Sequence, residues 1–76
     1  MDTRFFEKYQ DFGFAVARAR KLRGMTQQQL ADAMNVSYET ISRIETAATG
    51  FSGDTLFAIA QALNITVEEI FKYAQI

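Results

Sequence analysis

Apolar side chains along this chain recur every three or four residues, which is the period of an amphipathic helix. The first such stripe comprises Phe5, Tyr9, Phe12, Val16 and Ala19. Gly24 follows the stripe and suits the left-handed residue that commonly ends a helix, so we expect this helix to end near Arg23. Gly13 interrupts the stripe and leaves two starting points open, one near Thr3 and one near Asp11.

Two short helices are predicted next, joined by a tight turn. Thr26 and Gln29 have the spacing of a capping box, which marks the start of the second helix. Asn35 tolerates a left-handed backbone and ends that helix, and Ser37 can cap the one that follows. The helical spacing places six apolar residues in the core: Leu30, Ala31, Met34, Val36, Ile41 and Ile44.

A small, polar, glycine-dotted stretch, residues 46–53, predicts a loop before two further helices. The fourth helix ends at Asn64, and Thr66 with Glu69 forms a second capping box that begins the fifth. Their core-facing residues are Leu56, Ile59, Ala60 and Leu63, followed by Val67, Ile70, Phe71 and Ala74. Residues 60–70 repeat the pattern of residues 31–41 with five of eleven positions identical, which we interpret as two corners built on the same turn.

Composition narrows the range of functions for what we expect to be one domain, residues 1–76. The chain has no Cys and no His, which excludes thiolate metal sites, disulfides and the commonest general base. No carboxylate pair has a spacing that suggests convergence, since Glu68 and Glu69 are adjacent and diverge on a helix. No apolar run approaches the roughly 20 residues of a membrane span, and residues 1–4 do not begin a signal peptide. We therefore expect a cytoplasmic, non-enzymatic protein with no cofactor, no small-molecule ligand and no membrane partner.

The charge is distributed unevenly, although the formal net charge is only −1. Residues 1–25 carry six basic and three acidic side chains, a net +3. Residues 26–76 carry two basic and six acidic side chains, a net −4. Two interpretations stay open: a solvated helix face, or an electrostatic footprint for nucleic acid within the first third of the chain.

The second and third predicted helices form a helix-turn-helix candidate over residues 27–45. The two halves of the motif read LRGMTQQQLA (Leu22–Ala31) and VSYETISRIE (Val36–Glu45). Both resemble the phage-repressor (Xre/Cro-type) helix-turn-helix family of DNA-binding domains, and the similarity extends over about residues 12–71. The resemblance implies an all-α fold, a compact five-helix lambda-repressor-like domain in which residues 1–11 extend the first helix.

In that family the second helix of the motif lies in the major groove of double-stranded DNA. The resemblance therefore implies a DNA-binding set of eight residues: Gln27, Gln28, Ser37, Tyr38, Glu39, Thr40, Ser42 and Arg43. Arg43 is the leading candidate because a guanidinium can donate two hydrogen bonds to one guanine. Gln27 and Thr40 are candidates for phosphate contacts, whereas Tyr38 and Glu39 either contact bases or simply cover the helix.

The resemblance also implies a partly buried ion pair between Arg20 and Glu45 that ties the first helix to the third. After this Glu the family usually continues with Gly and then Lys or Arg, but this chain has TAATG, residues 46–50, without a positive charge. The candidate replacements for phosphate contacts are the backbone amides of Thr49 and Gly50 and the side chains of Lys21 and Arg23. With few cations at the interface, we expect weak binding per monomer and a shallow dependence of affinity on salt.

Two functions of different classes remain open. The first is a sequence-specific transcriptional regulator, with repression the expected direction, that binds a palindromic DNA site as a homodimer. Its candidate dimer contacts, with the intramolecular core as the alternative, are Phe51, Phe57, Phe71, Tyr73 and Ile76. The second is a protein-interaction module of the same fold, such as an antitoxin or a repressor partner, with weak or no DNA binding. Its candidate docking residues, which otherwise cap the core, are Phe5, Phe6 and Tyr9.

Overall fold

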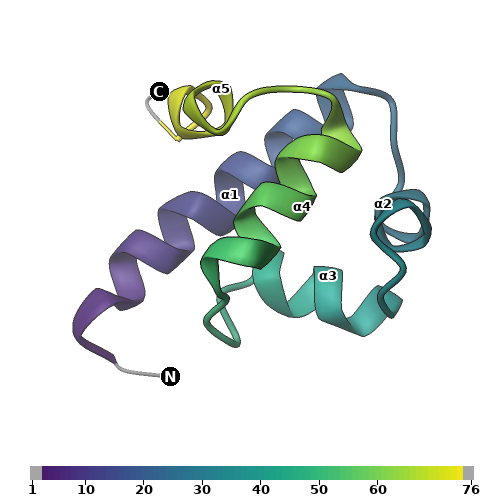
Figure 1. Cartoon of the computed structure of the whole chain (residues 1–76). Coiled ribbons are helices and arrows are strands. Elements are labelled where there is room, and N and C mark those ends of the chain that lie inside the picture. The colour runs from purple at the N-terminus through teal and green to yellow at the C-terminus, as the bar shows by residue number, and fades with distance from the viewer. Residues whose placement is uncertain (1–2, 75–76) are drawn as a thin grey trace.

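A computed structural model describes residues 3–74, which form helices joined by turns (Figure 1). The elements are a 3-10 turn (Thr3–Phe5) and the helices α1 (Phe6–Leu22), α2 (Gln27–Met34), α3 (Tyr38–Glu45), α4 (Gly53–Leu63) and α5 (Val67–Lys72). No strand occurs within the described range, and the expected all-α, five-helix fold is confirmed.

Most helix boundaries follow from the predicted capping residues. The Thr26 hydroxyl accepts from the Gln29 N–H at 3.0 Å, and Gln29 Oε1 accepts from the Thr26 N–H at 2.8 Å, which completes the capping box of α2. The same arrangement recurs at the start of α5. Asn35 and Asn64 end α2 and α4 with left-handed φ values of 57° and 56°, and Gly24 follows α1 with a φ of 72°. The repeated sequence pattern thus encodes two similar corners.

The start of α4 differs from the sequence prediction, and the end of α3, which was predicted correctly, uses a turn that the sequence did not signal. α4 begins at Gly53, inside the predicted loop, because the Ser52 hydroxyl caps its first turn. α3 is closed by Ala47 in a left-handed conformation (φ 59°), and the Ala48 N–H donates to the Arg43 carbonyl at 2.9 Å. Glycine is the residue normally found at such a turn, so alanine there offers no sequence signal for it.

The start of the first helix, which the sequence left open, lies at Phe6 and so nearer to the earlier alternative. Gly13 is buried within α1, where a Cβ atom would lie 2.5 Å from the Ile44 carbonyl oxygen and 2.7 Å from that of Glu45. Gly13 therefore does not break the helix. It admits the last turn of α3 against the backbone of α1.

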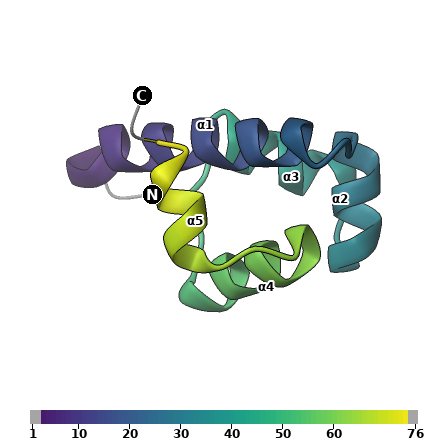
Figure 2. The same cartoon turned by 90° about the horizontal axis from the view of Figure 1, so that it is seen from above.

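Figure 2 shows α1 along one side of the molecule and α4 along the opposite side, with α5 and α2 towards the two ends. The buried cluster between them comprises Phe12, Ala15, Val16, Ala19, Leu30, Ala31, Ile41, Ile44, Ile59, Ala60, Leu63 and Ile70. Two residues of the predicted apolar stripes, for which burial in the core was one of two alternatives, are half-exposed, Phe5 at 52% and Phe71 at 46%. Phe5 lies in the 3-10 turn, where the helical period no longer sets its direction, and α5 has only six residues and buries Ile70 alone.

Candidate nucleic-acid interface

α3 has one buried and one exposed side. Ile41 and Ile44 anchor it in the core, with exposed fractions of 0% and 3%. Tyr38, Glu39 and Arg43 are exposed to solvent, Tyr38 with 47% of its surface accessible. A phenol, a carboxylate and a guanidinium are therefore all available on one short helix.

The other predicted residues of this segment carry hydroxyl groups, and among them Ser37 is exposed. Thr40 and Ser42 are half-buried. The Ser37 hydroxyl accepts from the Thr40 N–H at 3.2 Å and lies 2.9 Å from Thr40 Oγ1, so it serves as the N-cap of α3. Contacts of these three hydroxyls with nucleic acid stay predictions.

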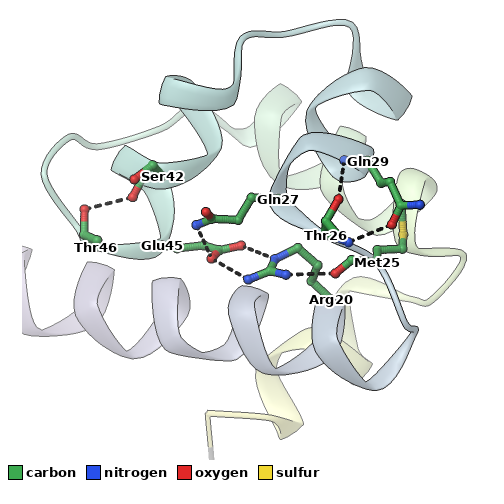
Figure 3. Close-up of polar contacts among 8 residues, drawn as sticks. All are labelled: Arg20, Met25, Thr26, Gln27, Gln29, Ser42, Glu45 and Thr46. Carbon is green, nitrogen blue, oxygen red and sulfur yellow. Dashed lines mark hydrogen bonds and ion pairs between the residues drawn. The ribbon is translucent and has the colours of Figure 1, made fainter.

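A buried polar network holds the C-terminal end of α3 (Figure 3). Arg20 Nε donates to Glu45 Oε2 at 2.7 Å, and Arg20 Nη2 donates to Glu45 Oε1 at 3.0 Å. Arg20 Nη1 also donates to the Met25 carbonyl at 2.8 Å, so the same guanidinium holds the turn between α1 and α2. The two charged side chains are only 8% and 6% exposed. The expected ion pair is confirmed, and its two-point geometry fixes the orientation of both partners.

Gln27 joins this network, which the sequence pattern did not indicate. Its Nε2 atom donates to Glu45 Oε1 at 3.0 Å. An amide nitrogen carries two hydrogens, so this bond uses only one of its donors. Gln28, by contrast, is exposed and donates to Asp32 Oδ1 at 2.8 Å within α2 itself. Gln27 is therefore oriented by another helix, whereas Gln28 is not.

A surface hollow of about 290 Å³ lies between α3 and the start of α4. The residues that line it are Thr40, Arg43, Ile44, Thr49, Gly50, Phe51 and Thr55. The Arg43 guanidinium of α3 lies at this hollow together with hydroxyl groups from α3, the following loop and α4. Thr55 was missed by the sequence reasoning because nothing local distinguishes it from an ordinary residue in the first turn of a helix.

The four basic side chains of residues 18–23 differ in their surroundings. Arg20 is used inside the polar network described above. Arg23 Nη2 donates to the Asn64 carbonyl at 2.6 Å, at the end of α4 that lies farthest along the helix from the hollow. Arg18 and Lys21 are exposed on α1. Arg23 is therefore poorly placed to replace the positive charge that the loop lacks.

Residues 3–74 carry neither a metal-binding cluster nor a membrane-spanning helix. The described residues include no cluster of three or more acidic side chains that could hold a metal ion. Within the same range, no helix has both the length and the apolar character that a bilayer crossing requires.

Comparison with known families decides which class of domain this is. The helix-turn-helix family pattern matches residues 16–70, more than two thirds of the chain, and includes both α2 and α3. This chain belongs to the Xre/Cro-type helix-turn-helix family. The family consists of DNA-binding domains and not of enzymes, and α3 corresponds to its recognition helix.

Individual helix-turn-helix proteins support this assignment. A competence pilus inhibition repressor from Acinetobacter baylyi is 43% identical over 65 residues, or 86% of this chain. The chain spans only 59% of the length of that repressor. The crystal structure of the clp gene regulator ClgR from C. glutamicum is similar with a TM-score of 0.83 at 27% identity, covering 88% of this chain and 87% of that one. The restriction-modification controller protein C.AhdI from Aeromonas hydrophila has a TM-score of 0.82 at 23% identity over 86% and 98% of the two chains, which supports the fold alone.

Proposed function

We propose that this chain is a sequence-specific regulator of transcription that binds double-stranded DNA with α3 in the major groove. The observation that carries the proposal is the exposed surface of α3, on a helix held by the buried Arg20–Glu45 pair in a helix-turn-helix chain. The relative from Acinetobacter baylyi is a repressor, which favours repression as the direction of control.

Arg43 is proposed as the main base-reading residue. It is exposed, and a guanidinium can donate to both O6 and N7 of guanine, which discriminates against other bases by about 1–3 kcal/mol. The exposed ring of Tyr38 suits a thymine methyl group, and the Glu39 carboxylate suits the amino group of cytosine.

Phosphate contacts are proposed at two places that flank α3. The first is Gln27, whose second amide hydrogen and whose position in the first turn of α2 both favour an anionic oxygen. The second is the hollow lined by Thr40, Arg43 and Thr49, where hydroxyl groups and one cation take the place of the basic loop residues usual in the family. Such contacts fix the register of the protein on the duplex.

A homodimer is proposed because palindromic half-sites about 34 Å apart match two-fold related helix-turn-helix domains. Phe57 of α4 is the strongest candidate contact, since 63% of its surface is exposed. The rings of Phe51 and Phe71 pack against α1, and Tyr73 packs against the core, so these three contribute less free surface. Ile76 lies outside the described residues.

The proposal is tested by selecting bound sequences from a random duplex library at low salt. We expect wild-type protein to enrich a palindrome, and Arg43→Ala to lose the enrichment while it unfolds at the same urea concentration as wild type. Lys72→Ala is the matched control, because it removes the same charge from an exposed site on α5. Equal enrichment by wild type and Arg43→Ala would contradict the assigned role of Arg43.

A protein-interaction module of the same fold is the second candidate. It is favoured by Phe5 and Phe6, which are 52% and 39% exposed, and by the lack of a cation in residues 46–50. Tyr9 fits this candidate less well, because its ring packs edge-on against Phe51 with centroids 5.0 Å apart. If wild-type protein enriches no sequence at all, this second function replaces the first.

A further inference from the structure

The solvent side of α1 carries exposed residues that the proposed DNA-binding surface does not use. We call the following set the α1 outer face: Glu7, Gln10, Asp11, Phe14, Arg18 and Lys21, all exposed. Figure 2 shows α1 along an outer edge of the molecule. Phe14, near the middle of the helix, is 50% exposed.

The charges of the α1 outer face are separated about Phe14. Glu7 and Asp11 precede it, and Arg18 and Lys21 follow it. Within the described chain none of these four charged side chains has an ion-pair or hydrogen-bond partner. The helix dipole favours acids in the first turn and bases in the last, but its influence fades within one turn. The helix dipole therefore explains neither the charges of Asp11 and Arg18, which lie away from the helix ends, nor the exposed ring of Phe14.

We propose that the α1 outer face binds the same face of a second copy of this chain, with the two helices antiparallel about a two-fold axis at Phe14. Glu7 lies seven positions before Phe14 and Lys21 seven positions after it, so each Glu7 faces Lys21 of the second copy. Asp11 lies three positions before and Arg18 four positions after, so these two also meet. By symmetry each charge pair occurs twice.

The angular positions around α1 agree with this register. At about 100° per residue, Glu7 and Lys21 lie roughly 20° to either side of the direction of Phe14. Asp11 and Arg18 lie on one common side, at roughly 60° and 40°. Two-fold symmetry requires paired residues to lie on the same side of the contact line. Asp11 and Arg18 meet this condition, whereas Glu7 and Lys21 lie about 20° to opposite sides, an offset that two long side chains can span.

The surface of α1 also provides a receptor for a side chain of the second copy. Phe14, Ala17, Arg18, Lys21 and Leu22 line a hollow on its solvent side. The first four occupy successive positions i, i+3, i+4 and i+7, which form the four-residue hole of helix pairs that pack knobs into holes. In the proposed register the side chain above this hole is Gln10 of the second copy.

The contact is modest in size and independent of the function proposed above. A single helix pair buries less than the standard interface of about 1,600 Å², so we expect a dissociation constant in the micromolar range. The α1 outer face contains none of the eight residues of the proposed DNA-binding set, and only Lys21 was a candidate replacement for a phosphate contact. The contact is therefore expected with or without DNA, and it lies on a different element from Phe57.

The proposal is tested by reversing charges on the α1 outer face and measuring self-association by sedimentation equilibrium. One variant, Arg18→Glu with Lys21→Glu, has an acidic outer face, and another, Glu7→Lys with Asp11→Lys, has a basic one. We expect each to self-associate at least about tenfold more weakly than wild type, and their equimolar mixture to regain the wild-type affinity. Any contact through Phe57 is common to all samples, so the difference reports on α1 alone.

Two further samples separate the specific contact from general attraction. Combining all four substitutions restores complementary faces at unchanged net charge, and we expect wild-type association from that variant. Asp54→Lys with Glu68→Lys alters net charge as the basic-face variant does, but at exposed sites on α4 and α5. We expect a mixture of this control with the acidic-face variant to associate no more tightly than the acidic-face variant does alone. Equal affinities in all samples, or tight binding by this control, would overturn the proposal.

A disulfide provides an independent measure of the register. The chain has no cysteine, so Phe14→Cys introduces a single thiol at the proposed axis. Helix axes 8–10 Å apart bring two residues on the axis within the Cα separation that a disulfide spans. We expect Phe14→Cys to form a linked dimer at least about tenfold faster under mild oxidation than Gln61→Cys, an exposed control on α4. Equal rates would contradict the register.

Discussion

Glu45 is the side chain on which the orientation of the recognition helix depends. It receives two hydrogen bonds from Arg20 of α1 and one from Gln27 of α2, and it lies at the end of α3. The three helices α1, α2 and α3 are therefore held together at this one carboxylate. A buried charge that loses its partner costs far more than an exposed one, so this site controls stability as well as orientation.

Removing the carboxylate is expected to destabilise the protein strongly. Glu45→Ala strands the Arg20 guanidinium, which is 8% exposed, and should lower the free energy of unfolding by about 3 kcal/mol. Urea unfolding followed by far-UV circular dichroism measures the change. Glu39→Ala removes the same group from an exposed site on the same helix and is expected to change stability by less than about 0.5 kcal/mol. Similar losses from both variants would show that the network does not hold the fold.

Gln27 allows phosphate binding to be separated from base reading. If its second amide hydrogen donates to a phosphate, Gln27→Ala weakens every duplex alike, by about threefold to tenfold. Arg43→Ala is expected instead to weaken the selected sequence more than a random one. Fluorescence anisotropy on both duplexes measures the two ratios. A Gln27→Ala variant that lost affinity only for the selected sequence would refute the phosphate assignment.

At the scale of the elements, the short helices α2 and α3 are stabilised by packing against other helices and not by their own tendency to be helical. α2 and α3 have eight residues each, too few for a stable helix in water, where about 12–15 residues are marginal. They persist because α2 packs against α3 and α4, and α3 packs against α2 and α1. α3 also approaches α1 closely enough to reach Gly13. The position of the recognition helix is therefore set by one backbone-to-backbone contact in addition to its buried isoleucines.

Gly13→Ala is expected to destabilise the protein although alanine favours helices. The new methyl group would lie 2.5 Å from the Ile44 carbonyl oxygen, and backbone has to move to admit it. We expect a loss of about 1–3 kcal/mol, which outweighs the gain of about 1 kcal/mol in helix propensity. Gly53→Ala, in the first turn of α4 with no atom within 4 Å of the new carbon, is the control and should be neutral or slightly stabilising. Thermal unfolding of the two variants measures the contrast, and equal melting temperatures would argue against close packing.

At the scale of the whole molecule, the distribution of charge is unusual for a DNA-binding domain. The net charge is −1, and residues 26–71 hold a single basic side chain, Arg43. Of the other cations, Arg20 and Arg23 serve the fold, and Arg18 and Lys21 belong to the α1 outer face. We therefore expect affinity for DNA to rest on few ion contacts per protomer.

Because few cations are placed to bind phosphates, we expect the affinity for DNA to depend only weakly on salt concentration. If each protomer of a homodimer places one cation on phosphate or in the groove beside it, the slope of log K against log salt is about −2. Anisotropy titrations between low and physiological salt measure the slope. We expect Arg43→Ala to flatten it further and Gln27→Ala, which removes no charge, to leave it unchanged. A slope steeper than about −5 would mean that cations outside α3 bind the duplex.

Much of the fold and part of the site were determined by the sequence, because the responsible interactions are local. A capping box joins residues three positions apart, and the left-handed turns at Asn35 and Asn64 depend on a side chain tolerated there. The helical period likewise depends only on neighbours along the chain, and it placed Ile41 and Ile44 in the core and left Tyr38 and Arg43 outside. The exposed surface of the recognition helix was therefore predictable, and the family resemblance also supplied the Arg20–Glu45 pair.

Only the tertiary structure decided the features that join distant parts of the chain. Gln27 meets Glu45 across 18 positions, and Arg23 meets the Asn64 carbonyl across 41. Gly13 is needed because the backbone of α3 passes beside it, and the hollow at Arg43 combines side chains from three segments. No local pattern encodes such contacts, since each depends on the distance and angle at which helices pack. The sequence determined which helices form and which sides they bury, and packing determined what their polar groups meet.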